Sequence, residues 1–257
     1  IRQASAKEKP FFLYLPYTSP HKPVIPMDEF KGKSQCGAYG DFMIETDHRI
    51  GQILKTLDEL KIAENTMVIF SSDNGAENTW AARIEAHDHR SNGIYRDGKR
   101  SRYEGGHRVP FLIRWPAGIK AGSTCHNAVC QTDFLATFAE MLGAELPADA
   151  GEDSASFYPA LTGKSIARGA MIHHASNGQF AIREGDWKLI VNTGTAGRRG
   201  KKPQGAPAPT KVSYELYNLK DDPSETKNLQ AESPKKVTLL EALLKKIKTG
   251  TRSVPVE

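Results

Sequence analysis

A carboxylate and an amide stand side by side shortly after an apolar run of the sequence. Residues 66–70 (Thr-Met-Val-Ile-Phe) are apolar on both alternate faces, and Asp73 and Asn74 follow in the stretch Ser-Ser-Asp-Asn-Gly. A charged oxygen next to a neutral carbonyl oxygen suits a hard divalent cation such as Ca²⁺ or Mg²⁺. Because Asp-Asn-Gly is also a favoured turn sequence, these residues alone predict a turn more strongly than a metal site.

A basic segment with two adjacent glycines is the second candidate. Residues 97–110 precede another apolar run, and their cations are Lys99, Arg100, Arg102 and Arg108. A lysine held in such a loop supplies a positive charge to a tetrahedral oxyanion. Gly105 and Gly106 let the backbone pass close to another group. Taken alone, the segment also fits a basic surface loop.

The third candidate is a histidine on a loop that prolines stiffen. His21 follows the apolar run 11–15 (Phe-Phe-Leu-Tyr-Leu), and Pro16, Pro20 and Pro23 surround it. Proline lacks the backbone N–H and fixes φ, so this loop forms neither a helix nor a central strand. The pattern predicts an imidazole held at the carboxyl end of a strand.

The apolar periodicity predicts the elements that must position these side chains. Residues 11–15 and 66–70 predict strands covered on both faces, and residues 39–60 predict an amphipathic helix between them. A strand, a helix and a strand in this order indicate a right-handed crossover in a parallel sheet. Since ligands bind at the carboxyl ends of such strands, we expect His21 and the acid–amide pair to lie together there.

Three further features of the first half bear on the fold. Residues 109–115 predict another strand, and residues 132–142 predict another helix. Asp47 falls on the apolar stripe of the 39–60 helix, so we expect a partly buried carboxylate with a partner.

The sequence changes character beyond residue 144. Residues 181–183 and 187–191 flank Glu-Gly-Asp and predict a β-hairpin, and residues 214–218 predict a third strand. Ser233-Pro234 opens a helix, whose apolar stripe is Val237, Leu240, Leu244 and Ile247. We therefore expect a small antiparallel sheet with a helix over residues 151–257. Residues 1–150 are expected to form an α/β domain with a mostly parallel sheet between helices.

The charge distribution argues against a general nucleic-acid surface. The net charge is +5, and the cations of residues 192–211, which contain no acid, are Arg198, Arg199, Lys201, Lys202 and Lys211. The remaining residues are therefore neutral on average. The Gly and Pro content of this stretch predicts a solvated loop, and docking of a polyanion is the alternative. No apolar run approaches the roughly 20 residues that a membrane span needs.

The cysteines argue against a zinc site. Cys36, Cys125 and Cys130 form no Cys-x-x-Cys pair. Cys125 and Cys130 are equally consistent with a small disulfide in an exported protein and with two thiols.

Together and in this order, the candidate segments resemble the type I (arylsulfatase-like) sulfatases of the alkaline phosphatase superfamily. The matching segments are 11–23, 70–77, 98–116 and 184–190, with Leu216-Tyr217-Asn218-Leu219 ahead of Asp222, Pro223 and Glu225. The resemblance extends over nearly the whole chain. It implies an alkaline phosphatase-like α/β fold and the hydrolysis of sulfuric esters.

The resemblance also implies roles for individual residues. Asp73 and Asn74 look like two ligands of the family's active-site Ca²⁺. Lys99 and His21 look like the groups that hold the sulfate oxygens and assist the leaving group. The supporting loop residues would be Glu104 and Arg108.

The family's nucleophile is not among the residues of this chain. Sulfatases of this type have an Asp-Asp pair near the start and a Cys-x-Pro-Ser-Arg segment whose cysteine becomes formylglycine, and neither is found here. The resemblance thus implies a C-terminal portion that lacks the N-terminal sulfatase segment. We expect little activity from it alone, because a Ca²⁺ with two protein ligands takes most of its oxygens from water.

The resemblance implies two partners: a sulfate ester, including sulfated carbohydrate, and the missing N-terminal segment. It implies no nucleic-acid partner. The family suggests a periplasmic or extracellular protein.

Two other functions stay open. A phosphodiesterase or phosphotransferase of the same superfamily uses Ser or Thr as nucleophile and two metal ions. Asp88-His89 is the loop candidate for its extra ligands, since Asp47-His48 belongs to the predicted helix. The other alternative is a non-catalytic domain that binds sulfated polysaccharide through the basic loop 198–211.

Overall fold

The chain forms two compact units in the computed structural model. The structure describes residues 1–7, 9–193 and 212–254. Unit 1 comprises Ile1–Gly93 and Val109–Ala121, and unit 2 comprises Ile94–Arg108 and Gly122–Glu257. These units do not coincide with the division expected at residue 150, because residues 94–108 and 122–150 pack in the same unit as the C-terminal sheet. The basic loop 198–211 lies outside the described residues.

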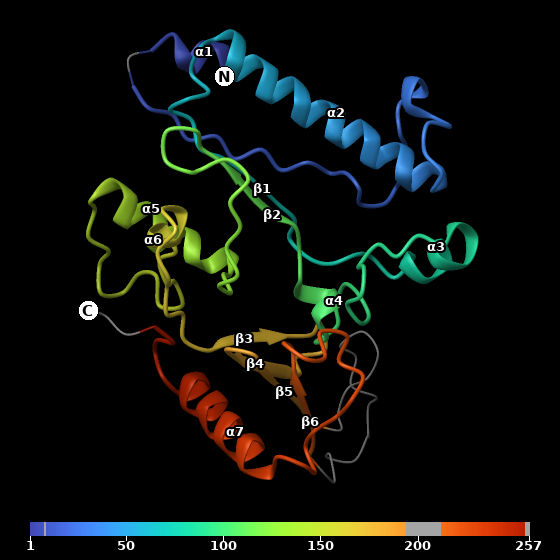
Figure 1. The fold of residues 1–257 in the computed structure, drawn as a ribbon, viewed down its shortest axis with the longest axis vertical. Coiled ribbons are helices and arrows are strands. Elements are labelled where there is room, and N and C mark those ends of the chain that lie inside the picture. Colours follow the sequence, from blue (N-terminus) through green and yellow to red (C-terminus); the bar gives the residue numbers. More distant parts are fainter. Residues whose placement is uncertain (8, 194–211, 255–257) are drawn as a thin grey trace, which may run out of the picture. The chain divides into compact units, whose positions relative to one another are not determined.

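Unit 1 contains one long helix and a two-stranded sheet (Figure 1). Its helices are α1 (Arg2–Ser5), α2 (Gly37–Glu59) and α3 (Trp80–His87), with the 3-10 turn η1 (Asp28–Phe30). Strands β1 (Val68–Ser71) and β2 (Phe111–Arg114) pair antiparallel, with Val68 opposite Arg114 and Ser71 opposite Phe111. The strands predicted over 66–70 and 109–115 and the helix predicted over 39–60 are confirmed.

The inward-facing polar residue near the middle of α2 is Thr46, not the neighbouring Asp47 that the sequence pattern predicted. Asp47 is exposed, so the prediction of a partly buried carboxylate there was wrong. Thr46 takes the inward position instead, where its Oγ1 is hydrogen-bonded to Ser19 Oγ at 2.7 Å. This bond ties the loop that carries His21 to the helix.

The buried carboxylate of α2 is Asp41, one turn from the helix start. It accepts hydrogen bonds from the backbone N–H groups of Gly32 and Ser34 at 2.8 and 2.7 Å. These two bonds lower the pKa of Asp41 and satisfy the oxygens that burial would otherwise leave unpaired.

The apolar run 11–15 forms no strand, which contradicts the prediction. Its side chains are open to solvent, and Phe12 and Tyr14 keep 79% and 76% of their surface. A run that is apolar on both faces becomes a central strand only where neighbours cover both sides. In the described residues β1 pairs with β2 alone, so the expected parallel pairing is absent.

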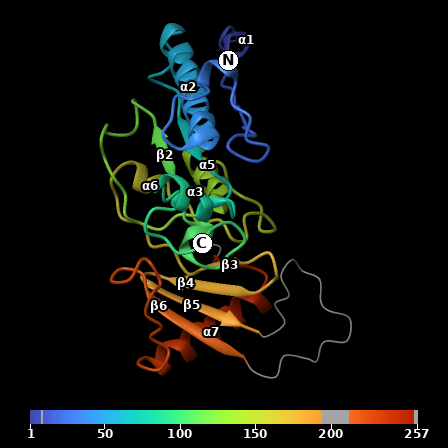
Figure 2. The ribbon, with the colours of Figure 1, turned by 90° about the vertical axis from the view of Figure 1, so that its right-hand side faces the viewer.

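Unit 2 contains a four-stranded antiparallel sheet in the order β3-β4-β5-β6 (Figure 2). The strands are β3 (Met171–His174), β4 (Phe180–Glu184), β5 (Trp187–Asn192) and β6 (Ser213–Asn218). The helices are α4 (Glu104–His107), α5 (Phe134–Leu142), α6 (Tyr158–Leu161) and α7 (Pro234–Thr249), with the 3-10 turn η2 (Gln131–Asp133). The predicted hairpin, third strand and two helices are confirmed, whereas β3 was not predicted.

Helix α7 covers one face of this sheet (Figures 1 and 2). The core between them is made of Ala170, Ile182, Leu189, Leu216, Leu240 and Leu244. Val237 and Ile247 pack at its border, as the predicted stripe requires. The hairpin turn between β4 and β5 places Gly185 at φ 56, a conformation that glycine adopts without a steric penalty.

Cys36, Cys125 and Cys130 are free thiols in the structure. None of the helices in the described ranges is long and apolar enough to span a bilayer.

Candidate active site

His21 lies on an exposed turn of unit 1. Its backbone N–H donates to the Thr18 carbonyl at 2.9 Å, and its Nδ1 is hydrogen-bonded to the Lys22 carbonyl at 2.7 Å. A carbonyl oxygen only accepts, so the proton of the neutral ring sits on Nδ1. This tautomer leaves Nε2 as the atom that can take up and pass on a proton.

Asp73 and Asn74 form the turn that follows β1. Asn74 uses its side-chain N–H to bind the Gly75 carbonyl at 2.9 Å, and Ser72 Oγ donates to the Asn74 carbonyl at 3.1 Å. The Asp73 carboxylate and the Asn74 side-chain oxygen accept no hydrogen bond from the described residues. Both oxygens are thus available to a hard cation, and their chemistry fits Ca²⁺. Among the described residues, no group of three or more His, Cys, Asp or Glu could hold a metal ion.

Lys99 sits in a tight turn of unit 2. It is half-buried, and its ammonium group has no hydrogen bond or ion pair with the described residues. Its neighbours Asp97 and Arg100 have φ values of 62° and 78°, in the left-handed region that side chains rarely adopt. The turn therefore presents a positive charge that no described residue pairs with, on a backbone that its surroundings must hold in place.

Gly105 and Gly106 pack against the backbone of this same turn. A Cβ on Gly105 would lie 2.2 Å from the Asp97 carbonyl oxygen, and one on Gly106 would lie 2.6 Å from the Ser101 carbonyl oxygen. The Gly105 N–H donates to the Arg96 carbonyl at 2.9 Å. The close approach predicted for the two glycines is thus to the Lys99 turn itself.

Glu104 is buried in a cluster of charged groups. Its carboxylate accepts a hydrogen bond from Lys188 Nζ at 2.9 Å and pairs with Arg183 at 3.4 Å. Lys188 is fully buried and also pairs with Glu225 at 2.9 Å. Burial opposes the ionisation of Glu104, but Lys188 and two arginines outweigh it and lower its pKa. Burial raises the pKa of Glu225, against the attraction of Lys188.

Arg108 closes the exposed side of the cluster. Its Nε lies 3.6 Å from Glu104 Oε2, and its guanidinium carbon lies 5.0 Å from the centroid of the Tyr95 ring. The side chain is 41% exposed, so this pair contributes little to stability by itself.

The sequence patterns did not indicate Lys188, Arg183 and Glu225 as members of the cluster. One signal was present: Lys188 interrupts the apolar run Trp-Lys-Leu-Ile-Val, where a strand with both faces buried leaves no place for an unpaired ammonium. Its two partners lie far away in the sequence, and only the fold shows them.

The candidate residues are divided between the two units. His21, Asp73 and Asn74 belong to unit 1, whereas Lys99, Glu104 and Arg108 belong to unit 2. Within unit 1, no hydrogen bond among the described residues joins His21 to the Asp73–Asn74 turn. The meeting of these groups around one anion stays a prediction.

Two protein-family models match overlapping parts of this chain. Residues 1–144 match the model of the family described as Sulfatase, and residues 93–197 match that of N-sulphoglucosamine sulphohydrolase, C-terminal. The N-acetylgalactosamine-6-O-sulfatase of Bacteroides thetaiotaomicron is 38% identical over 95% of this chain and 48% of its own length. Human steryl-sulfatase is 43% identical over 62% of this chain and 27% of its own length.

Solved structures show the same likeness. One, described under the metabolism of multiple glycosaminoglycans by Bacteroides thetaiotaomicron, superposes with a TM-score of 0.81 at 36% identity, covering 97% of this chain and 53% of that one. Ps i-CgsB in complex with k-i-k-neocarrahexaose gives a TM-score of 0.77 at 25% identity, covering 96% and 52%. This chain thus spans about half the length of these relatives. It belongs to the sulfatase family and has the alkaline phosphatase-like α/β fold of its members.

Proposed function

We propose that this chain is the C-terminal portion of a sulfatase that hydrolyses sulfuric esters with a formylglycine nucleophile supplied by the preceding segment. The observation that carries the proposal is Lys99, which pairs with none of the described residues and is held in a strained turn inside a region that two sulfatase family models match. An ammonium without a protein partner is what an anionic sulfate group requires.

Each candidate residue has a defined task in this proposal. Lys99 stabilises the charge that develops on the sulfate oxygens in the transition state. His21 passes a proton through Nε2 towards the leaving-group oxygen, while its Nδ1 stays bonded to the Lys22 carbonyl. Asp73 and Asn74 would hold Ca²⁺, which when bound supplies positive charge next to the sulfate group and the nucleophile.

The substrate class we propose is a sulfated carbohydrate. Relatives that cover nearly the whole of this chain include an N-acetylgalactosamine-6-O-sulfatase and a protein solved with k-i-k-neocarrahexaose. The two alternative functions have no observation of their own in the described residues. Asp88, the loop candidate for the metal ligands of a phosphodiesterase, is the C-cap of α3 and adopts the left-handed conformation. The basic loop 198–211, the candidate for polysaccharide binding, lies outside the described residues.

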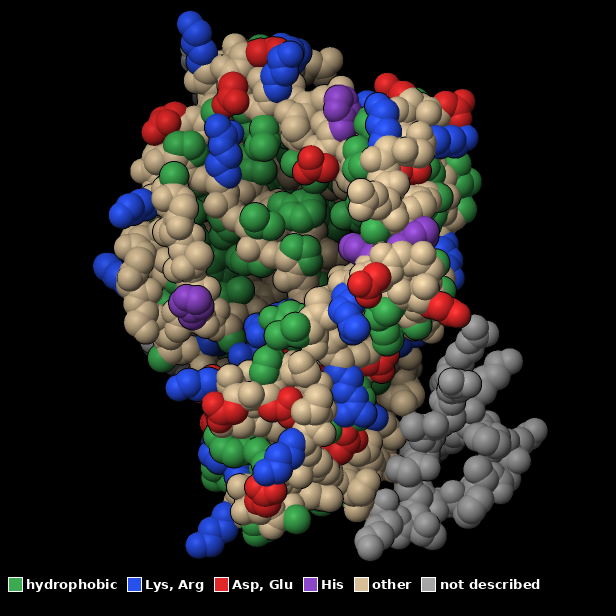
Figure 3. Space-filling model, turned by 45° about the vertical axis from the view of Figure 1, so that its right-hand side comes forward, with side chains coloured by type: hydrophobic (Ala, Val, Ile, Leu, Met, Phe, Trp, Pro, Cys, Tyr) green, Lys and Arg blue, Asp and Glu red, His purple; other side chains and the backbone are tan. Residues whose placement is uncertain are grey.

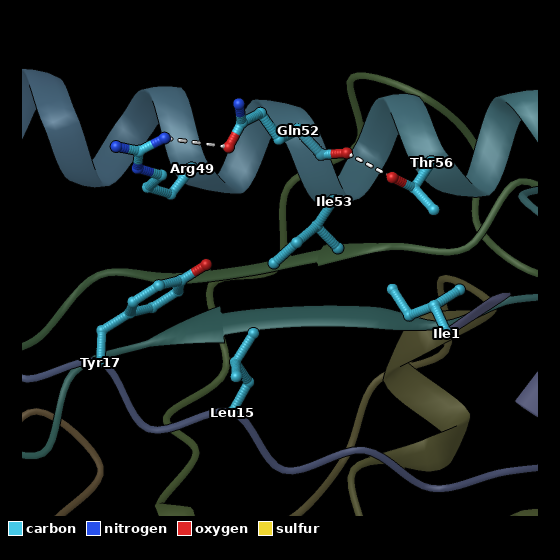
Figure 4. A pocket seen from close by; sticks show the side chains of 7 residues that line it. All are labelled: Ile1, Leu15, Tyr17, Arg49, Gln52, Ile53 and Thr56. Atoms are coloured by element: carbon cyan, nitrogen blue, oxygen red, sulfur yellow. Dashed lines mark hydrogen bonds between the residues drawn. The ribbon is translucent and has the colours of Figure 1, made fainter. Parts of the chain in front are cut away.

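An exposed apolar segment supports the proposal that more of the fold packs on unit 1. Leu15 and Tyr17 line a hollow of about 290 Å³ beneath α2, together with Ile1 and Ile53 (Figure 4). Arg49 and Thr56 lie at the helix side of the hollow. A soluble protein rarely leaves a contiguous run of large apolar side chains open to water. In the relatives, about half of the chain lies outside the region matched here.

The first experiment measures hydrolysis by the complete polypeptide that contains this segment. We expect it to hydrolyse a 6-sulfated N-acetylgalactosamine or a simple aryl sulfate faster than the matching phosphate ester. Lys99→Ala should lower kcat by about 10²–10³-fold, the range seen when one oxyanion-stabilising group is removed. Lys55→Ala, on the exposed side of α2, is the matched control and should change nothing. A phosphate ester hydrolysed faster than the sulfate ester would contradict the proposal.

The second experiment removes the cation. Exhaustive chelation should abolish the hydrolysis, and Ca²⁺ should restore it in the parent but poorly in an Asp73→Ala variant. Activity that survives chelation unchanged would contradict the assignment of Asp73.

The third experiment uses the isolated chain, residues 1–257. It should show no turnover of an aryl sulfate, because it contains no formylglycine segment. Turnover by pure material that disappears in Lys99→Ala would refute the proposed division of the site.

A further inference from the structure

The strained turn around Lys99 needs an external support. Asp97 and Arg100 both adopt left-handed backbone conformations, at φ 62° and 78°. Non-glycine residues keep such conformations only where the surrounding structure leaves no alternative. Within the turn, Gly98 N–H donates to Asp97 Oδ1 at 2.9 Å, and Ser101 N–H donates to the Gly98 carbonyl at 3.1 Å.

The support begins with α4, which lies against the turn. Gly105 and Gly106 bring the backbone of α4 so close to the carbonyls of residues 96–101 that neither position has room for a Cβ. The bond from Gly105 N–H to the Arg96 carbonyl, at 2.9 Å, joins the two segments directly. Any shift of α4 must therefore move the turn that carries Lys99.

Helix α4 is in turn fixed by the buried charges of the C-terminal sheet. Its first residue, Glu104, donates its backbone N–H to Glu225 Oε2 at 2.6 Å and places its carboxylate 2.9 Å from Lys188 Nζ. Lys188 stands on β5 and joins both carboxylates, and Arg183 on β4 reaches Glu104 at 3.4 Å. A four-residue helix could not hold its orientation without such anchors.

A second connection runs from Glu225 back to the turn. Arg96 donates to the Glu225 carbonyl at 2.9 Å, and its guanidinium carbon lies 3.8 Å from the centroid of the Tyr103 ring. Glu225 itself has φ 53°, so it too is held in an uncommon conformation. The Lys99 turn is thus attached at both ends, through Arg96 and through α4, to the residues around Lys188.

We propose that Lys188 is a positioning residue, which through Glu104 and Glu225 holds the Lys99 turn in the conformation that meets the sulfate group. This inference rests on the proposed function for the role of Lys99. A buried ion cluster is seldom more stabilising than well-packed apolar side chains of the same volume. Directional contacts between three charged groups, however, fix the orientation of α4, which apolar packing would not.

Hydrogen exchange on this chain tests the mechanical part of the inference. Lys188→Met removes the link, whereas Leu240→Ala, in the core between α7 and the sheet, weakens unit 2 without contacting the cluster. The two variants are compared under conditions equally far from their own unfolding midpoints. We expect the amides of residues 96–108 to exchange at least 10-fold faster in Lys188→Met than in Leu240→Ala. Equal exchange in both variants would overturn the inference.

A conservative variant keeps the test meaningful where Lys188→Met fails to fold. Lys188→Arg retains the charge but not the geometry of the ammonium, because a guanidinium is planar and larger. It should fold and show intermediate exchange in residues 96–108, with the amides of β5 and β6 protected as in the parent. Loss of protection over the whole sheet together with the loop would overturn the inference, because it would assign Lys188 to stability alone.

Kinetics of the complete sulfatase test the functional part. Lys188→Met should lower kcat by roughly 10–100-fold, the effect of a misplaced catalytic group, whereas Leu240→Ala should leave it unchanged below its unfolding range. The double variant Lys188→Met, Lys99→Ala should be no slower than Lys99→Ala, because Lys188 acts only through Lys99. Losses that multiply would overturn the inference. A parent enzyme inactive on sulfate esters would refute the proposed function while leaving the exchange result intact.

Discussion

Two histidines beside the charged cluster show how burial controls protonation at single residues. The rings of His107 and His173 stack with their centroids 4.6 Å apart. Burial and the nearby Lys188 ammonium lower the pKa of His107 to about 4, and the same causes hold the pKa of His173 well below its usual value. The Nε2 atoms of both rings are buried without a partner in the described structure. Both rings are therefore neutral at pH 7.

This arrangement predicts a loss of stability in mild acid. The unfolded histidines bind protons below about pH 6.5 and the folded ones only at lower pH, so acid favours the unfolded state. The free energy of unfolding is therefore highest, as far as these two groups are concerned, above about pH 6.5. It falls as the pH drops towards 4, where His107 titrates in the folded protein. Urea unfolding at pH 7 and pH 5 should show the lower midpoint at pH 5. A His107→Gln, His173→Gln variant should have a flatter profile, and an equally steep one would exclude these groups.

The glycines of α4 give a second prediction for single residues. Gly105→Ala puts a Cβ 2.2 Å from the Asp97 carbonyl oxygen, so either α4 or the Lys99 turn must move. We expect a destabilisation of at least about 2 kcal/mol, as for other overpacked sites. Gly169→Ala is the matched control in the same unit, because its Cβ would meet nothing within 4 Å. Equal thermal midpoints for the two variants would show that the approach is not tight.

Helix α2 shows what local sequence contributes to an element. It runs from Gly37 to Glu59, and its apolar face includes the buried Leu57. Helical propensity and periodicity both act within a few residues, which explains why its position followed from the pattern. The inward direction of Thr46 did not, because it depends on a hydrogen bond to a loop that precedes the helix.

One substitution tests the helix by itself. Gly51 lies exposed in the middle of α2, and a Cβ there would contact nothing within 4 Å. Gly51→Ala should stabilise unit 1 by about 0.5–1 kcal/mol, because alanine loses less conformational freedom in a helix. The rise should be visible in the thermal midpoint. Gly37→Ala, at a position where φ is +59°, should instead lower the thermal midpoint.

On the face of the molecule shown in Figure 3, positive and negative side chains are interspersed with exposed apolar ones. Within the apolar stretch 11–17, Phe12 and Tyr14 are the most exposed side chains. If the chain is part of a longer sulfatase, as proposed above, the preceding part of the fold is expected to cover this stretch.

The isolated chain should therefore bind an apolar dye and associate with itself. Phe12→Ser with Tyr14→Ser should reduce both effects, whereas Leu142→Ser, which alters a side chain 74% exposed elsewhere, should have a smaller effect. Addition of the N-terminal half of the sulfatase as a separate polypeptide should suppress dye binding by the parent chain. Dye binding unchanged by either treatment would exclude the stretch as a covered surface.

The sequence by itself determined α2, β1, the β4–β5 hairpin and α7, because turn residues and apolar periodicity are local signals. It also pointed to the sulfatase family, since Asp73, Asn74 and Lys99 stand in recognisable segments. Only the tertiary structure decided that residues 11–15 form no strand, since a strand exists only where a neighbour pairs with it. Only the fold, likewise, showed that Lys188 pairs with Glu104 and Glu225. A buried charge needs a partner, and the chain topology decides which distant residues come close enough to pair with it.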